Sequence, residues 1–365
     1  MEPAPRNILR EDPLSKDDTM ALRGMLVVLI IVFHCSFYYS FTFPDLGHIA
    51  VSMFLFFSGY GLELSLHRKK GYLKGFPSNR IFGILVQYWT IVLAIAVIGL
   101  LMYPGTDPID RIASALLKTP HWFVVEILAF YVLFYLTGTL LRKEGIRITA
   151  TIICTFLLMF LMFRYYGSAL YYLSGAGFAF GIIWYHIRER AGTNRLIVVA
   201  SIVLPLIVLI LTDGRGDKGI QDMAEASISC IASIVLVTGL QSIDLRRGWP
   251  IHLMTLILGI VLFLMTDTDR EGASFIVFAS ICSILTQMRI SNRTFAFLGV
   301  MSFEMYLMHE TFYLYVWNNV VHYEPLAFTV SLICAILASY AVYRISDRIL
   351  KRMRETLSSE METGS

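Results

Sequence analysis

The chain has 365 residues, of which 56% are hydrophobic and 16% charged, and its mean hydropathy is +0.66. Soluble domains carry about 45–50% apolar and about 25% charged residues, so this composition excludes a soluble globular protein. The formal net charge of +3 is small and no basic stripe interleaves with aromatic residues, which argues against a nucleic-acid partner. The five cysteines lie singly in apolar runs, so we expect packing residues rather than disulfides or metal ligands.

The chain begins with a polar stretch, 1–18, that predicts a loose cytoplasmic lead. The apolar stretch 21–43 exceeds the about 7–15 residues of a signal-peptide core, so it predicts a membrane helix. Similar stretches recur along residues 19–350, which we interpret as one membrane domain, and the polar tail at 351–365 is expected to be cytoplasmic and disordered. The fold class is therefore all-α, a polytopic transmembrane bundle of about 10–12 helices. The expected spans are 21–43, 48–66, 81–103, 121–141, 148–164, 169–187, 196–212, 222–241, 250–265, 272–288, 294–318 and 326–347.

The charge of the connecting loops alternates along the chain. Loops 67–80, 142–147, 188–195, 243–248 and 288–293 are rich in Lys and Arg, whereas the loops between them are mixed or acidic. Because the loops with the excess of Lys and Arg face the cytoplasm, both termini are expected there. No internal repeat is strong enough to indicate inverted halves.

Two ionisable residues, Arg23 and His34, lie eleven residues apart in the first apolar stretch, RGMLVVLIIVFH. A helix places His34 about 16 Å beyond Arg23. If Arg23 lies at one membrane surface, His34 lies near the middle of a hydrocarbon core about 30 Å thick. Such a residue predicts a functional site, and the alternative is a packing His that bonds to a neighbouring helix.

Buried carboxylates are expected in the later spans. Glu63 lies near the cytoplasmic end of the second span, where Arg80 or Lys74 could pair with it. Glu126 and Glu304 lie inside apolar segments, where a carboxylate needs a partner or a task.

The span at 294–318 also contains His309, which shares a helical face with Tyr313. His309 is either functional or packs against the first helix. Neither an HExxH pair nor a His/Asp cluster with zinc spacing occurs, so no metal is expected.

Four motifs then resemble the integral-membrane acyltransferase family 3. They are the Arg23-x10-His34 pair, FFSGY at 56–60, HWFVVEILAFY at 121–131 and LGVMSFEMYLMH at 298–309. They occur in the order of the family and extend over nearly the whole chain. The family also carries an RxxR pair at its third helix, where Arg80 matches the first Arg but Gly83 stands in place of the second.

The resemblance implies transfer of an acyl group, usually acetyl from acetyl-CoA, to a hydroxyl of a cell-envelope saccharide or related acceptor. It implies a multi-pass protein of the bacterial plasma membrane, surrounded by lipid, of the stand-alone type without an extracytoplasmic esterase domain. A secondary transporter and a non-catalytic membrane assembly protein remain the alternatives.

The residues and the resemblance together suggest a division of roles. His34 would be the general base or a transient acyl carrier, oriented by other polar groups. The expected catalytic residues are His34, Glu126, Glu304 and His309. The expected acyl-CoA ligands are Arg23, Arg80 and Lys74. The expected acceptor-binding residues are Ser58, Tyr60, Trp122 and Tyr306.

Overall fold

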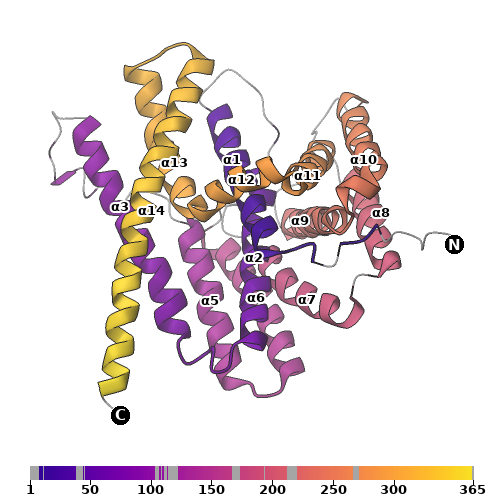
Figure 1. Cartoon of the computed structure of the whole chain (residues 1–365), viewed down its shortest axis with the longest axis horizontal. Coiled ribbons are helices and arrows are strands. Elements are labelled where there is room, and N and C mark those ends of the chain that lie inside the picture. The colour runs from indigo at the N-terminus through magenta and orange to yellow at the C-terminus, as the bar shows by residue number, and fades with distance from the viewer. Residues whose placement is uncertain are drawn as a thin grey trace. The chain divides into compact units, whose positions relative to one another are not determined.

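The computed structural model describes residues 8–10, 12–37, 44, 46–102, 107, 109–110, 113, 122–166, 173–192, 194–211, 220–265 and 271–363. Within these residues the chain is helical, and the single β-bridge joins Leu9 to Ile243 (Figure 1). The predicted all-α fold is confirmed. In chain order the helices are α1 (Lys16–Ser36), α2 (Gly47–Arg68), the π-helix η1 (Pro77–Ile81), α3 (Phe82–Met102), α5 (Trp122–Leu140), α6 (Glu144–Tyr166), α7 (Ala176–Ala191), α8 (Arg195–Leu211), α9 (Ile220–Gln241), α10 (Leu245–Met265), α11 (Glu271–Gln287), α12 (Arg289–Val300), α13 (Ser302–Asn319) and α14 (Glu324–Thr363).

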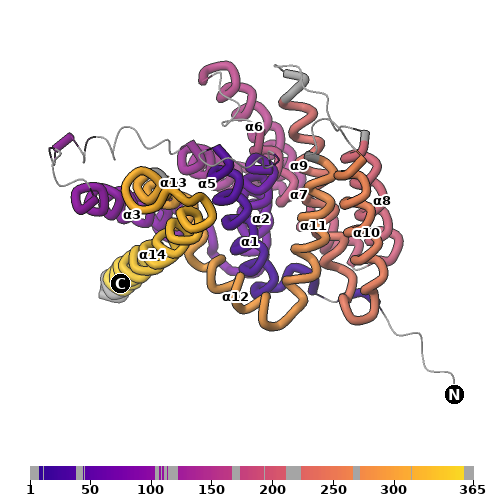
Figure 2. Tube along the Cα trace, turned by 90° about the horizontal axis from the view of Figure 1, so that it is seen from above, coloured from indigo at the N-terminus to yellow at the C-terminus, as the bar shows by residue number. Residues whose placement is uncertain are grey.

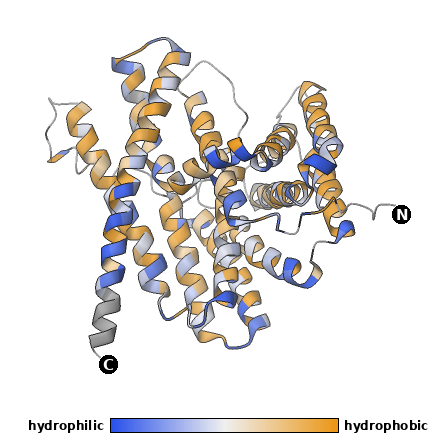
Figure 3. Ribbon diagram, in the orientation of Figure 1, coloured by the Kyte–Doolittle hydropathy of each residue, from blue (hydrophilic) through white to orange (hydrophobic). Residues whose placement is uncertain are grey.

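Eight helices in the described ranges are long and apolar enough to cross a membrane. The count is nine if α11 and α12, which meet at a bend of 106°, form one broken span. The sequence suggested about ten to twelve because it counted every apolar stretch. Among those stretches, α7 has only 16 residues and α8 only 17. Figure 3 shows the hydrophobic residues that run along most of the helices.

The chain divides into two compact units, and the first comprises residues 1–33, 42–70 and 140–300. In this unit α2 packs on α7, and α9 packs on both α8 and α11 (Figure 2). Glycines make the α2–α7 approach possible, because a Cβ on Gly59 would collide with the carbonyl oxygen of Phe178 and one on Gly181 with that of Phe56. Small residues of this kind permit close approach of two helices.

A second close crossing joins α1 to α12 in the same unit. A Cβ on Gly24 would overlap the carbonyl oxygen of Phe295, and a Cβ on Gly299 would overlap that of Met20. Only glycine allows two helix backbones to approach so closely.

The described part of the N-terminal lead, residues 8–10 and 12–18, is tied to the first unit rather than loose. Arg10 pairs with Asp18 at 2.7 Å, and Arg188 pairs with Asp12 at 2.7 Å. The polar composition of the lead predicted a loose segment. Two of its charged residues, Arg10 and Asp12, instead form ion pairs with residues of α1 and α7.

The second unit comprises residues 34–41, 71–139 and 301–365. Here α14 packs against α3 and α13, and α3 also packs against α13, as both views show (Figures 1 and 2). Ile91, Val124 and Met308 are among the buried residues of its core. The tail predicted as disordered instead continues α14 as far as Thr363.

Candidate active site

Two histidines meet in the second unit, one from the end of α1 and one from α13. His34 Nδ1 lies 2.7 Å from His309 Nε2, and the two rings are stacked with centroids 5.0 Å apart. His309 is buried and His34 is partly exposed. The structure therefore joins two of the four residues that the sequence proposed as catalytic.

The hydrogen bonds of His309 set the direction of this pair. His309 Nδ1 lies 3.2 Å from the carbonyl oxygen of Met305, one turn earlier on α13, so this nitrogen carries the hydrogen and donates it. Nε2 of a neutral His309 then accepts a hydrogen from Nδ1 of His34. In a neutral His34 the proton-accepting nitrogen is consequently Nε2.

Glu310, a carboxylate that was not among the expected catalytic residues, completes the cluster. Its Oε1 lies 3.6 Å from Nδ1 of His34, and its side chain is 49% exposed. A negative charge at this distance stabilises the imidazolium that forms when His34 takes up a proton. Its position next to His309 in the sequence was the only signal.

Aromatic rings surround the histidines. The His309 ring lies 5.3 Å from that of Tyr313 and 6.1 Å from that of Tyr306. Tyr306 in turn makes an edge contact with Phe123 of α5, and Trp122 contacts the same Phe123. Two of the proposed acceptor-binding residues, Trp122 and Tyr306, thus belong to a series of ring contacts that runs through Phe123 to His309.

The two buried glutamates differ in their surroundings. Glu126 lies one turn from Phe123 on α5, and neither carboxylate oxygen has a hydrogen-bond partner among the residues that the structure describes. Glu304 instead accepts a hydrogen bond from Ser346 of α14 at 3.4 Å. The structure therefore places Glu304 at the α13–α14 packing contact.

The three proposed donor-binding cations have different environments. In the first unit the Arg23 guanidinium lies 5.9 Å from the ring centroid of Phe57. In the second unit Arg80, on η1, donates from Nε to the hydroxyl of Tyr72 at 3.0 Å, and Lys74 is exposed.

The other two proposed acceptor-binding residues, Ser58 and Tyr60, lie in the first unit. Ser58 donates back to the carbonyl oxygen of Phe54 on its own helix at 3.1 Å. Tyr60 accepts a hydrogen bond from Arg188 at 2.9 Å. Their part in acceptor binding stays a prediction.

The predicted partners of Glu63 were wrong. Glu63 is fully buried in the first unit, where Arg147 of α6 donates to both of its carboxylate oxygens. His186 of α7 also contacts Glu63, at 2.9 Å. The sequence favoured Arg80 or Lys74 because they are close in the chain, and it had no signal for residues more than 80 positions away.

Comparison with known proteins agrees with this architecture. The model of the acyltransferase 3 family, described as an acyltransferase domain, matches residues 20–344. Searches of curated proteins and of solved structures give no match. The family match covers nearly the whole chain and extends over both units. The chain is thus a multi-pass membrane protein that belongs to the acyltransferase 3 family.

Proposed function

We propose that the protein transfers an acyl group, acetyl in the first instance, from acyl-CoA to a hydroxyl of a cell-envelope saccharide. The observation that carries this proposal is the His34–His309 pair, which orients His34 as a base. The loop charges favour a cytoplasmic donor and place both termini in the cytoplasm. We treat residues 19–350 as one acyltransferase domain, since the family match continues through both units.

The proposed reaction is a single displacement. Nε2 of His34 takes the proton of the acceptor hydroxyl, and the acceptor oxygen attacks the thioester carbonyl carbon. The new C–O ester bond forms, the C–S bond breaks, and the sulfur of CoA receives the proton from His34. The direction of the His34–His309 hydrogen bond places the transferable proton on the side of His34 that faces away from His309.

His309 and Glu310 act on His34 rather than on the substrate in this scheme. His309 holds the ring tautomer, because its own Nδ1–H is committed to Met305. Glu310 compensates the positive charge that His34 carries between the two proton transfers.

The acyl-CoA phosphates require cations near the predicted cytoplasmic ends of the helices. Lys74 and Arg80 belong to the basic loop 67–80 that precedes α3, and Arg23 lies in the first half of α1. Guanidinium groups bind phosphate in a bidentate manner, which supports Arg23 and Arg80 as phosphate ligands.

The direct test is a transfer assay on the purified protein in lipid nanodiscs. Acetyl-CoA is supplied with a panel of saccharides, and released CoA and acetylated product are measured by mass spectrometry. We expect product with at least one saccharide in wild type, a rate lower by about 10²–10⁴-fold with His34→Gln, and an unchanged rate with the exposed control His322→Gln. Equal rates in wild type and His34→Gln would contradict the proposal.

A second variant pair tests the tautomer argument. His309→Ala removes the acceptor for Nδ1–H of His34 and should lower the rate by at least about 10²-fold, as expected for a misoriented imidazole. His309→Gln supplies a side-chain carbonyl oxygen that accepts the same hydrogen bond, so it should recover to within roughly tenfold of wild type. Equal losses in the two variants would remove the positioning role.

A single-turnover experiment distinguishes this displacement from the alternative in which His34 carries the acyl group covalently. Labelled acetyl-CoA is mixed with wild-type protein without acceptor, and the protein is analysed for a labelled His34. The displacement scheme expects no label, whereas an acyl carrier expects up to one label per chain.

A further inference from the structure

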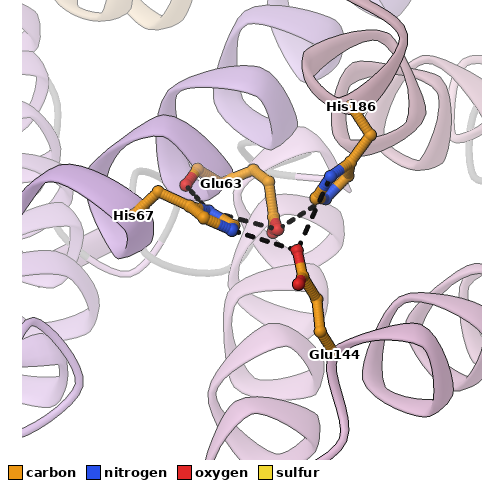
Figure 4. A group of neighbouring side chains, drawn as sticks. All are labelled: Glu63, His67, Glu144 and His186. Atoms are coloured by element: carbon orange, nitrogen blue, oxygen red, sulfur yellow. Dashed lines mark hydrogen bonds and ion pairs between the residues drawn. The ribbon is translucent and has the colours of Figure 1, made fainter. Parts of the chain in front are cut away.

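A second group of His and Glu residues lies in the first unit. Among the residues that the structure describes, it shares no member and no hydrogen-bond partner with the acyl-transfer residues. Glu63 and His67 come from α2, Glu144 from the first position of α6, and His186 from α7 (Figure 4). One donor atom from each residue lies within 4.8 Å of the others. Figure 4 shows the two imidazoles facing the two carboxylates from opposite sides.

The hydrogen bond that His67 makes within α2 sets its tautomer. His67 Nδ1 lies 3.0 Å from the main-chain oxygen of Glu63, so Nδ1 carries the hydrogen and donates it. Nε2 of a neutral His67 then presents a lone pair, yet it lies 3.1 Å from Oε1 of Glu144. Two acceptors at this distance repel each other unless a cation lies between them.

His186 approaches the same two carboxylates. Its Nε2 lies 2.9 Å from Oε1 of Glu63, and its Nδ1 lies 3.7 Å from Oε1 of Glu144. A neutral His186 satisfies its contact with Glu63 by donating from Nε2, whereas the contact between His67 and Glu144 requires a cation. That cation is either a proton on His67 or a metal ion shared by all four residues.

We propose that the cation is one divalent transition metal ion, zinc in the first instance, held by Glu63, His67, Glu144 and His186. Two imidazole nitrogens and two carboxylate oxygens are a donor set that zinc accepts, whereas calcium and magnesium take oxygen ligands. In a tetrahedral site with bonds of about 2.0–2.1 Å the donors lie about 3.4 Å apart. The contacts at 2.9 and 3.1 Å would lengthen and the wider ones, which reach no more than 4.8 Å, would close around the ion.

The surroundings match those of a metal site. A ligating histidine usually donates its other N–H to a backbone carbonyl, as His67 does to Glu63. Ligating carboxylates are in turn hydrogen-bonded, as Glu63 is by Arg147. With neutral histidines, the two carboxylates and Arg147 carry a net charge of −1, which a divalent cation changes to +1.

The role of this site is structural. Its ligands come from three helices that pack in one unit, and four protein ligands close the coordination sphere of a tetrahedral ion. The ion would clamp α2, α6 and α7 at their ends beside the basic loops 67–80, 142–147 and 188–195. This inference goes beyond the proposed acyl transfer and does not depend on it.

The test is a zinc count on the full-length protein without a polyhistidine tag. The protein is stripped with EDTA, equilibrated with buffered zinc alone at about 1 µM free ion, and analysed by mass spectrometry for zinc per chain. We expect about one zinc in wild type and at least a fivefold lower content in His67→Gln and in Glu144→Gln. Both altered side chains are partly exposed, so these variants should fold.

Two controls assign the ion to this cluster. His34→Gln removes the other group of histidines and carboxylate that could hold a metal, and His252→Gln removes a buried histidine outside both groups. Both should keep the wild-type zinc content. The melting temperature should rise with zinc in wild type and not in His67→Gln.

Three outcomes would overturn the proposal. They are no zinc in wild type at this concentration, an unchanged content in His67→Gln and Glu144→Gln, and loss of zinc in His34→Gln alone. The first would leave protons as the cations, and the last would assign zinc to the acyl-transfer residues. None of these readouts measures acyl transfer, so failure here is distinct from failure of the proposed function.

Discussion

The two units each contain a cluster of histidine and glutamate, and the clusters differ in what the imidazoles face. In the second unit His34 donates to His309, and the carboxylate of Glu310 is at 3.6 Å from His34. In the first unit His67 and His186 both face carboxylates, and Glu63 is already paired with Arg147. His34, bonded to a neutral imidazole, keeps one nitrogen available for proton transfer, whereas His67 and His186 with their carboxylates form the donor set proposed for zinc. Histidine and glutamate are therefore proposed to carry out proton transfer in one unit and to hold helices together in the other.

The largest expected effect, and the strongest test of this difference between the units, is on acyl transfer by His34 variants. His34→Ala and His34→Gln should both lower acyl transfer by about 10²–10⁴-fold, because neither side chain accepts a proton from the acceptor hydroxyl. The melting temperature of His34→Gln should stay near wild type, since Gln keeps the size and hydrogen-bonding capacity. Transfer rates and melting curves are measured on the same preparations. A His34→Gln protein with wild-type turnover would assign this histidine to packing.

The corresponding change in the first unit should affect stability instead. Arg147→Met leaves the buried carboxylate of Glu63 without its charged partner and should destabilise the protein by about 3–5 kcal/mol. The exposed neighbour Arg142→Met should change the stability by less than about 0.5 kcal/mol. Unfolding in denaturant, followed by tryptophan fluorescence, compares the two. If Arg147→Met kept full stability but lost transfer, the first unit would not be the structural one.

An Arg80 variant tests whether the second unit, which contains the His34–His309 pair, also binds acyl-CoA. Arg80→Ala should weaken acyl-CoA binding by about 1.5–3 kcal/mol, the value of a hydrogen bond to a charged group, and leave acceptor binding unchanged. Calorimetric titration with acetyl-CoA measures the effect, and Lys143→Ala, an exposed cation of another basic loop, is the control. Equal affinities in wild type and Arg80→Ala would remove Arg80 from the donor site.

The smallest effect concerns helix packing in the first unit. Gly299→Ala places a Cβ on the carbonyl oxygen of Met20 and should cost about 1–3 kcal/mol by overpacking α12 against α1. Gly83→Ala is the matched control, because a Cβ there has no neighbour within 4 Å and alanine favours the helix by roughly 0.5–1 kcal/mol. Melting temperatures that move in the same direction in both variants would contradict the close crossing.

The sequence predicted the class of fold and named both histidines of the acyl-transfer pair among its candidates, but not their contact. The apolar stretches predicted helices, and the spacing between Arg23 and His34 placed both on α1. The expected depth of His34 in the membrane stays a prediction. The pairing of His34 with His309 could not be derived, because the two residues are 275 positions apart and no local periodicity links them.

Charged partners were predicted least well, since the sequence offered only neighbours in the chain. Glu63 was expected to pair with Arg80 or Lys74, but packing of α2 against α7 brought His186 to it and α6 supplied Arg147. The one local signal in that cluster was the spacing of four residues between Glu63 and His67, which places both side chains on one helical face.

Helix α14 has a practical consequence for imaging this protein. Its 40 residues correspond to about 60 Å of continuous helix, whereas a hydrocarbon core is about 30 Å thick. Figure 3 shows the hydrophilic residues gathered on its lower half. About half of the helix therefore extends past the lipid as an unbroken rod. A helical partner protein fused in register after Thr363 would give a small membrane enzyme a rigid landmark for particle alignment in electron cryo-microscopy.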